Sequence, residues 1–319
     1  MIFKLTENQS DSGTEEPLRK EFYDMKKVFL IINPHSGKLK NKSMLFDIIN
    51  IMSENNCEVT IRFTSKPGDA KTFAKEACES KLYDSIVCSG GDGTLNETVS
   101  GTILSGCPLP IGYIPAGTTN DYAKTLGITS ETYKAANLSV TGKVATIDVG
   151  VINGVHFNYI ASFGAFTSVS YNAPRSLKKH LGHMAYILAG IKDITNIKSI
   201  PVKLESYDQK VEGDFIFGAI TNTTSIGGIV HLNDALVGFN DGEFEVCLVR
   251  KPKNPVEVVK VIKAALSSDF DNENFVFFKT DKITINLPDN VDWSIDGEKF
   301  PGSEIVNIEV LPGAAKLIL

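Results

Sequence analysis

A glycine-rich segment, Gly90–Glu97, has the residue types of a phosphate-binding loop. It reads GGDGTLNE, follows an apolar run at 85–88 and precedes a predicted helix over 94–104. Because glycine has no Cβ, such a backbone can approach a ligand closely and adopt positive φ. Its successive N–H groups and the start of the helix would both attract an anion. The segment therefore predicts a phosphate site in preference to the alternative, a simple glycine-rich turn.

Two other polar segments also follow predicted strands. Pro115–Asp121 reads PAGTTND after the strand 111–114, and Asn33–Lys38 reads NPHSGK after the strand 28–32. The carboxyl ends of parallel strands meet at one edge of an open α/β sheet, where ligands bind. Asn33–Lys38 lacks the G-x-x-x-x-G-K-[ST] spacing of a Walker A loop, so we reject a P-loop NTPase. Pro115–Asp121 would alone be a helix cap, but beside the glycine-rich segment it predicts a second wall of a nucleotide cleft.

A pair of carboxylates further along the chain could serve in proton transfer. Asp296 and Glu298 flank Gly297. Residues two apart in a strand point to the same face, so both could approach one hydroxyl, and one could accept its proton. A β-turn is the alternative, because Asp-Gly is common in turns. Asp92 of the glycine-rich segment competes with this pair for the role of proton acceptor.

The first part of the chain predicts the sheet that would position these loops. Strands are predicted at 28–32, 59–63, 83–88 and 111–114, and helices at 44–52, 69–80 and 94–104. Strands that alternate with helices indicate a parallel, doubly wound sheet.

The remainder has a different pattern, with short β-rich runs that indicate a mostly antiparallel domain. Strands are predicted at 144–151, 155–162, 201–207, 214–221, 243–249, 282–287 and 305–311, with helices near 175–196 and 255–267. We expect a polar N-terminal arm over 1–24, an α/β nucleotide-binding domain over 25–140 and a β-rich domain over 141–319. The last strands could return to pack on the first domain.

Composition limits the partners. The 319 residues carry a formal net charge of −6, which argues against a nucleic-acid partner because phosphate binding needs a basic excess. Five scattered cysteines without a C-x-x-C pair predict reduced thiols. We find no apolar leader and no stretch apolar enough to span a membrane, and expect a cytoplasmic protein. The basic amphipathic helix at 175–196 could touch an anionic membrane; a core-packed helix with a solvated basic face is the alternative.

Taken in order, the motifs resemble those of the diacylglycerol kinase catalytic-domain family, particularly its bacterial soluble lipid kinases. The family patterns N-P-x-[ST]-G, G-G-D-G-T-x-N-E and P-x-G-T-x-N-D match the three segments above, and two more match Asn240–Gly242 and Asp296–Glu298. The resemblance covers about residues 27–319. It implies an N-terminal doubly wound α/β nucleotide-binding domain, a mostly antiparallel β-sandwich domain that binds lipid and metal, and an active site in the cleft between them. NAD kinases and phosphofructokinases share this fold and the G-G-D-G signature.

The resemblance also implies roles for the matched positions. Asp296 and Glu298 would be the catalytic carboxylates, whereas related sphingosine kinases give a key role to the position of Asp92. Asp241 and the backbone carbonyls of Gly238 and Glu243 would hold Mg²⁺. The metal turn departs from the family pattern at Asn240, where Asp is frequent. The ATP site would be lined by Asn33, Pro34, His35, Ser36, Gly37, Thr64, Gly90, Gly91, Asp92, Gly93, Thr94, Leu95, Asn96 and Thr118.

We therefore predict an ATP- and Mg²⁺-dependent lipid kinase that converts diacylglycerol to phosphatidate. A kinase for another lipid, phosphatidylglycerol or a sphingoid base, is the first alternative, followed by NAD kinase and by a non-catalytic lipid- or nucleotide-binding regulator. The Asn96-Glu97 pair and the ending Thr119–Asp121 favour the lipid branch over NAD kinase. The presence of acidic residues at all four candidate site positions argues against a non-catalytic regulator; these are Asp92, Asp241, Asp296 and Glu298. We expect transient contact with a membrane surface. The sequence does not decide between a monomer and a homodimer.

Overall fold

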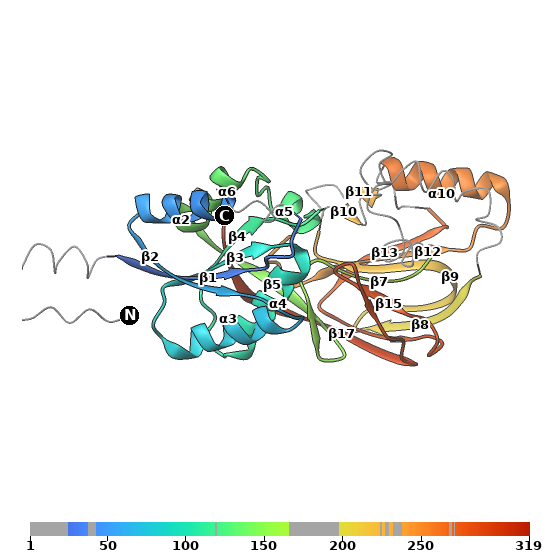
Figure 1. Ribbon diagram of the computed structural model, residues 1–319. Coiled ribbons are helices and arrows are strands. Elements are labelled where there is room, and N and C mark those ends of the chain that lie inside the picture. Colours follow the sequence, from blue (N-terminus) through green and yellow to red (C-terminus); the bar gives the residue numbers. More distant parts are fainter. Residues whose placement is uncertain are drawn as a thin grey trace, which may run out of the picture.

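The computed structural model describes residues 25–37, 43–118, 120–165, 198–223, 225–226, 230–231, 238–267, 270 and 272–319. Figure 1 shows an elongated molecule in which a helix-covered half and a mostly β half lie end to end. The predicted arm over 1–24 and the predicted basic helix over 175–196 lie outside the described residues. Within the ranges described, no helix is long and apolar enough to cross a membrane.

The first half is a parallel sheet with helices on both faces, as the sequence predicts. Alternate residues of its first strand show why: Val28, Leu30 and Ile32 pack against two helices of one face. Phe29 and Ile31 pack against a helix of the other face. A strand buried on both faces needs a continuous apolar run. The strands are β1 (Lys26–Ile32), β2 (Cys57–Phe63), β3 (Ser85–Gly90) and β4 (Ile111–Pro115), in the order β4-β3-β1-β2. The helices are α2 (Ser43–Glu54) and α6 (Thr132–Thr141) on the first face, α3 (Asp69–Ser80) on the second, α4 (Asp92–Leu104) beside α3, and the short α5 (Asp121–Thr125).

The second half is built from antiparallel strands around its own apolar core. Trp293 and Phe163 are fully buried at its centre, with ring centroids 4.8 Å apart. The elements are β5 (Val144–Ile152), β6 (Val155–Phe157), β7 (Ile160–Gly164), β8 (Ile200–Ser206), β9 (Lys210–Thr221), β10 (Ser225–Ile226), β11 (Val230–His231), β12 (Phe244–Arg250), α10 (Pro255–Ser267), β13 (Phe275–Thr280), β14 (Lys282–Asn286), β15 (Trp293–Ile295), β16 (Glu298–Phe300) and β17 (Ile305–Ile318).

The last strand connects the two halves. β17 pairs antiparallel with β14 and with β5, and near its end Leu317 pairs in parallel with Ile111 of β4. Its register against β5 shifts between Leu311 and Ala315, beside Gly313, whose φ of 57° suits glycine. One continuous sheet therefore runs from the α/β half into the β half (Figure 1).

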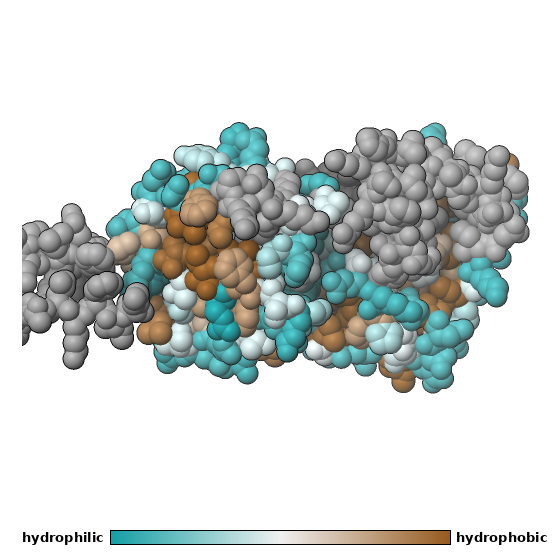
Figure 2. Space-filling model, viewed as in Figure 1, coloured by the Kyte–Doolittle hydropathy of each residue, from teal (hydrophilic) through white to brown (hydrophobic). Residues whose placement is uncertain are grey.

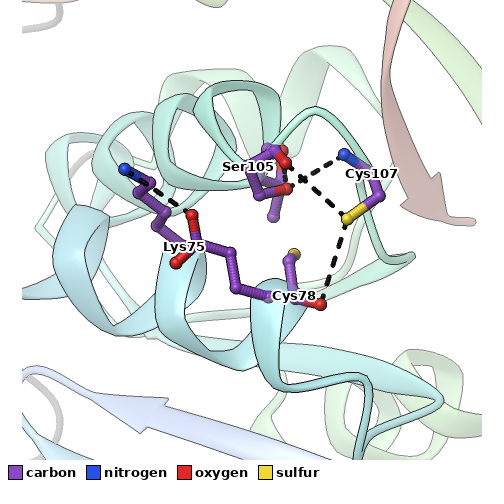
Figure 3. A network of polar contacts seen from close by, with 6 residues as sticks. Lys75, Cys78, Ser105 and Cys107 are labelled. Carbon is purple, nitrogen blue, oxygen red and sulfur yellow. Dashed lines mark hydrogen bonds and ion pairs between the residues drawn. The ribbon is translucent and has the colours of Figure 1, made fainter.

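Helices α3 and α4 pack closely on one face of the first sheet. Gly101 of α4 lies against the α3 backbone at Lys71, where a side chain would not fit. Figure 3 shows how the chain leaves α4: the Cys107 amide donates to Ser105 Oγ at 3.2 Å, and Cys107 Sγ lies 4.0 Å from the Cys78 carbonyl oxygen. The five cysteines are free, as predicted.

Apolar side chains gather on one edge of the α/β half. In Figure 2 the hydrophobic area lies between the helices that Figure 1 labels α2 and α3, where β2 is the edge strand of the sheet. Phe46 of α2 and Phe63 of β2 are 68% and 51% exposed.

Some elements differ from the sequence predictions. Helix α4 begins at Asp92 instead of near Thr94, and the strand predicted over 155–162 is two strands, β6 and β7. The sequence did not predict helix α6 or strands β10, β11, β13, β15 and β16. β15 and β16 have three residues each, too few for a period-2 pattern to stand out.

Candidate active site

Three loops meet at the carboxyl ends of β1, β3 and β4. Asn33 follows β1, and its Nδ2 donates to Thr94 Oγ1 in the first turn of α4 at 3.1 Å. Gly91, after β3, lies against Gly117, after β4: a Cβ built on Gly117 would come within 2.8 Å of Gly91 Cα. The edge of the sheet therefore brings together the segments from which the sequence predicts a nucleotide cleft.

The glycines of this region serve close approach and not positive φ. Gly91 has φ −93° and ψ −178°, and Gly90 and Gly93 are likewise absent from the positive-φ residues of the described chain. The prediction that these glycines adopt positive φ is therefore wrong, because α4 begins directly at Asp92. What remains of the predicted anion site is the first turn of α4, whose N–H groups lack helical partners.

A fourth loop follows β2 and is held in place by Glu97, a residue of the glycine-rich segment for which the sequence predicts no such role. The Thr64 amide donates to the Ile32 carbonyl at 2.9 Å, which places Thr64 beside the start of the Asn33 loop. Glu97 of α4 accepts hydrogen bonds from the amides of Gly68, at 2.8 Å, and Ala70, at 3.2 Å. Glu97 thus caps α3 and joins the loop after β2 to α4, the helix that begins at the predicted phosphate site.

Asp92 stands in the first turn of α4 beneath the loop after β4. Its Oδ2 accepts a hydrogen bond from the Asp121 amide at 3.0 Å. Burial raises the pKa of Asp92 to about 6, and the charges of Asp121 and Asp296 add to this rise. Asp92 therefore links the loops of β3 and β4 and ionises less readily than a solvated carboxyl.

Asp296, between β15 and β16, is a buried carboxylate surrounded by donors. Its Oδ2 accepts from the Asn158 amide and from Asn96 Nδ2, both at 2.7 Å. Its Oδ1 accepts from the amides of Tyr159 and Ile160, both at 3.1 Å. Burial raises the pKa of Asp296, and these hydrogen bonds oppose the rise. The three amides that turn toward Asp296 also explain why the strand predicted over 155–162 breaks into β6 and β7.

Glu298, two residues on, is exposed and reaches the glycine-rich segment of the other half. A Cβ built on Gly93 would lie 2.9 Å from Glu298 Oε1. This approach places a carboxylate of the β half beside the start of α4. Asn96 reinforces the same junction, since its amide nitrogen donates both to Asp296 and to the His156 carbonyl.

The remaining predicted ATP-site residues differ in exposure. Gly37 and Thr118 face each other, with 3.8 Å between the built Cβ of Gly37 and Thr118 Oγ1. His35 is exposed, its amide donating to Asn33 Oδ1 at 3.0 Å, while Pro34 is half-buried and Ser36 buried. The Leu95 side chain lies fully inside the apolar core, so only its backbone could face a nucleotide.

The turn that contains Asp241 lies in the β half. Asp241 Oδ1 accepts from the Glu243 amide at 3.2 Å, and Oδ2 lies against Gly238, where a built Cβ would be 2.5 Å from it. Asp148 of β5, fully buried, holds the turn by accepting from the amides of Gly242 and Gly313, both at 2.7 Å. The sequence offers one signal for Asp148, a lone carboxylate inside the apolar strand 144–152.

Two further charged residues adjoin this turn. Glu245 of β12 is fully buried, and burial raises its pKa to about 7. Lys279 of β13 pairs with Asp241 at 2.7 Å and with Glu245 at 3.4 Å. Carboxylate and carbonyl oxygens are the ligands that Mg²⁺ prefers, so the donor set of the turn fits that ion. The described residues hold no cluster of three or more acidic, histidine or cysteine side chains, so any metal ligand set here must include backbone carbonyls or water.

Comparison with known proteins identifies the chain. Residues 27–152 match the family model of the diacylglycerol kinase catalytic domain. A diacylglycerol kinase of Bacillus subtilis is 34% identical over 89% of this chain and 94% of its own length. The chain belongs to the diacylglycerol kinase family.

Further members of the diacylglycerol kinase family agree over both halves. A diacylglycerol kinase of Staphylococcus epidermidis is 31% identical over 89% of this chain and 90% of its own length. The crystal structure of a diacylglycerol kinase from Bacillus anthracis superposes with a TM-score of 0.76 at 27% identity, covering 92% of this chain and 97% of that one. The loops after β1 to β4 lie within the matched catalytic segment, whereas Asp241, Asp296 and Glu298 lie beyond residue 152.

Proposed function

We propose that this diacylglycerol kinase family member transfers the γ-phosphate of ATP to the hydroxyl of diacylglycerol and so forms phosphatidate. The observation that carries the proposal is the approach of Glu298 to Gly93, because it sets a carboxylate beside the predicted phosphate site. The names of the relatives support diacylglycerol as the acceptor. Kinases for phosphatidylglycerol or a sphingoid base remain the alternatives.

The phosphates of ATP would bind where the loops after β1, β3 and β4 meet. The first turn of a helix carries N–H groups without helical partners, and the partial positive charge at the start of α4 favours an anion there. Phosphoryl transfer depends on positioning and on charge stabilisation more than on covalent chemistry. The hydrogen bond from Asn33 to Thr94 and the packing of Gly117 against Gly91 would fix the shape of the loops.

Glu298 is our candidate proton acceptor. It would take the proton of the lipid hydroxyl while that oxygen bonds to the γ-phosphorus; the bond from phosphorus to the β–γ bridging oxygen breaks, and ADP leaves. Asp296 is a positioning residue in this scheme, since four hydrogen bonds already engage its carboxylate. Asp92 stays the second candidate, because its raised pKa also suits proton transfer.

Mg²⁺ is proposed at Asp241 with the carbonyls of Gly238 and Glu243. When bound, it would supply positive charge and order the turn before β12 that contains Asp241. We also propose that the enzyme meets its substrate at a membrane surface, because diacylglycerol carries two acyl chains that stay in the bilayer. The predicted basic helix that motivates such contact lies outside the described residues.

The test is Glu298→Gln, assayed with ATP, Mg²⁺ and a panel of lipids in mixed micelles. We expect kcat to fall by about 10²–10⁴-fold, the usual loss of a general base, with ATP affinity nearly unchanged. Glu304→Gln, an exposed carboxylate that follows β16, is the matched control. Wild-type turnover by Glu298→Gln would transfer the role to Asp92, and phosphorylation of a different lipid in the panel would replace diacylglycerol as substrate.

A further inference from the structure

Lys279 stands between two carboxylates at the turn to which we assign the metal. It is the direct cross-strand partner of Glu245, β13 against β12. Its Nζ lies 2.7 Å from Asp241 Oδ2 and 3.4 Å from Glu245 Oε1. One ammonium therefore forms ion pairs with two carboxylates, Asp241 in the turn before β12 and Glu245 in β12 itself.

Glu245 shows that this cation matters. Its side chain has no exposed surface, and neither carboxylate oxygen accepts a hydrogen bond within the described part of the chain. A buried carboxylate without a donor or a counter-charge is strongly destabilising. Lys279 supplies the counter-charge on the metal-free protein, and its own side chain stays 30% exposed, so its head can move toward solvent.

The Lys279 ammonium is hydrogen-bonded to Asp241 Oδ2, the oxygen that a bound metal would need. Asp241 Oδ1 already accepts from the Glu243 amide. Asp241 Oδ2 is the oxygen nearest Gly238, whose carbonyl is one of the proposed ligands, and it is the oxygen that Lys279 holds. A divalent cation at Oδ2 would take that position from Lys279 and would repel its charge at short range.

We infer that Lys279 is an internal competitor of the divalent cation at this turn. In the metal-free protein Asp241 and Glu245 share its ammonium; when Mg²⁺ binds, the ammonium leaves Asp241 and stays with Glu245 alone. The lysine thereby raises the Mg²⁺ concentration that the site requires. The inference rests on the metal site proposed at Asp241, and the experiment separates the two.

The experiment measures Mg²⁺ binding to the full-length, nucleotide-free protein by titration calorimetry. Lys279→Met keeps the aliphatic stem and removes the charge, and we expect Mg²⁺ to bind at least about tenfold more tightly than to wild type, since tenfold is a small part of the repulsion between charges a few ångströms apart. Lys282→Met is the matched control: Lys282 begins the next strand, pairs with Glu309 and is 68% exposed. Its Mg²⁺ affinity should stay within about twofold of wild type, as expected for a screened surface charge.

A second comparison guards against misfolding, because Lys279→Met leaves Glu245 buried without a cation. In a Glu245→Gln background no charge is left unpaired at that position, and adding Lys279→Met should again tighten Mg²⁺ binding. If wild type binds Mg²⁺ and removal of Lys279 leaves the affinity equal or weaker in both backgrounds, the inference is wrong while the metal site stands. If no variant and no wild type binds Mg²⁺, both the metal site and the inference fail.

Discussion

The two halves of the molecule hold their functional groups by different means. In the α/β half, the site loops meet through backbone and small side chains, as Gly91 and Gly117 do. In the β half, carboxylates are held by donors and cations: Asp296 by three backbone amides and Asn96, and Asp241 by Lys279. Substitutions in the first half should therefore act through steric clashes. Substitutions in the second half should act by leaving charges or hydrogen-bonding groups without partners.

The largest expected effect is on the buried carboxylate of the β half. Asp296→Ala should lower the free energy of unfolding by about 3–5 kcal/mol, because the buried amides of Asn158, Tyr159 and Ile160 lose their acceptor. Urea unfolding followed by the fluorescence of Trp293, the one tryptophan of the chain, would measure it. Glu298→Ala, two residues on and exposed, should stay within about 0.5 kcal/mol of wild type. Equal stability of the two variants would contradict the division of roles in which Asp296 positions the site and Glu298 accepts the proton.

Asp92 departs from this pattern, because it is a carboxylate in the α/β half whose charged form is disfavoured by burial. Its pKa rises from 3.8 to about 6 on folding, so wild type should lose stability as pH rises from about 4 to about 6. Asp92→Asn carries no such charge, and it should exceed wild type by up to about 3 kcal/mol above pH 6 and by nothing below pH 4. Thermal unfolding of the nucleotide-free proteins across this range is the measurement. A difference that does not change with pH would show that Asp92 ionises normally.

The same contrast governs what the sequence could reveal. The candidate site of the α/β half is made of contiguous segments that follow apolar strands, so order and composition alone select Asn33–Gly37 and Gly90–Asn96 as candidates. The supports of the β half arise from pairing across long separations: Asp296 meets Asn96 some 200 positions away, and Lys279 meets Asp241 38 positions away. No local pattern encodes such contacts.

Two local features could nevertheless have been found. Asp148 interrupts an otherwise apolar strand, and a lone buried carboxylate needs donors. Glu97 follows Gly93, the last glycine of the glycine-rich segment, by one helical turn, and its target lies in a loop whose position depends on how α3 packs on α4. The positive φ expected at the glycines was wrong because the same residue type also serves close packing, which composition alone does not separate.

A smaller effect should follow from closing the gap between the loops after β3 and β4. A Cβ on Gly117 would lie 2.7 Å from Asn120 Oδ1 and 2.8 Å from Gly91 Cα, whereas a Cβ on Gly91 meets Gly117 Cα at an ordinary 3.5 Å. Gly117→Ala should therefore destabilise the nucleotide-free protein by about 1–3 kcal/mol. Gly91→Ala should leave its melting temperature unchanged and weaken only ATP binding. Equal melting temperatures for the two variants would contradict the close packing of these loops.

The smallest expected effect comes from Glu97→Gln, which tests whether a charge helps to position the loop after β2 in the α/β half. Glu97 accepts two amides at the start of α3, where a negative charge is favoured by the helix dipole. Glu97→Gln keeps one acceptor and loses the charge, so it should cost about 1 kcal/mol of stability. Because Glu97 also fixes the loop that carries Thr64, the KM for ATP should rise a few-fold while kcat changes less. Glu79→Gln, which breaks only the exposed pair with Lys75, should change neither quantity. If Glu97→Gln lowers kcat with the KM unchanged, the loop after β2 does not position ATP, and Glu97 acts nearer to the reacting atoms.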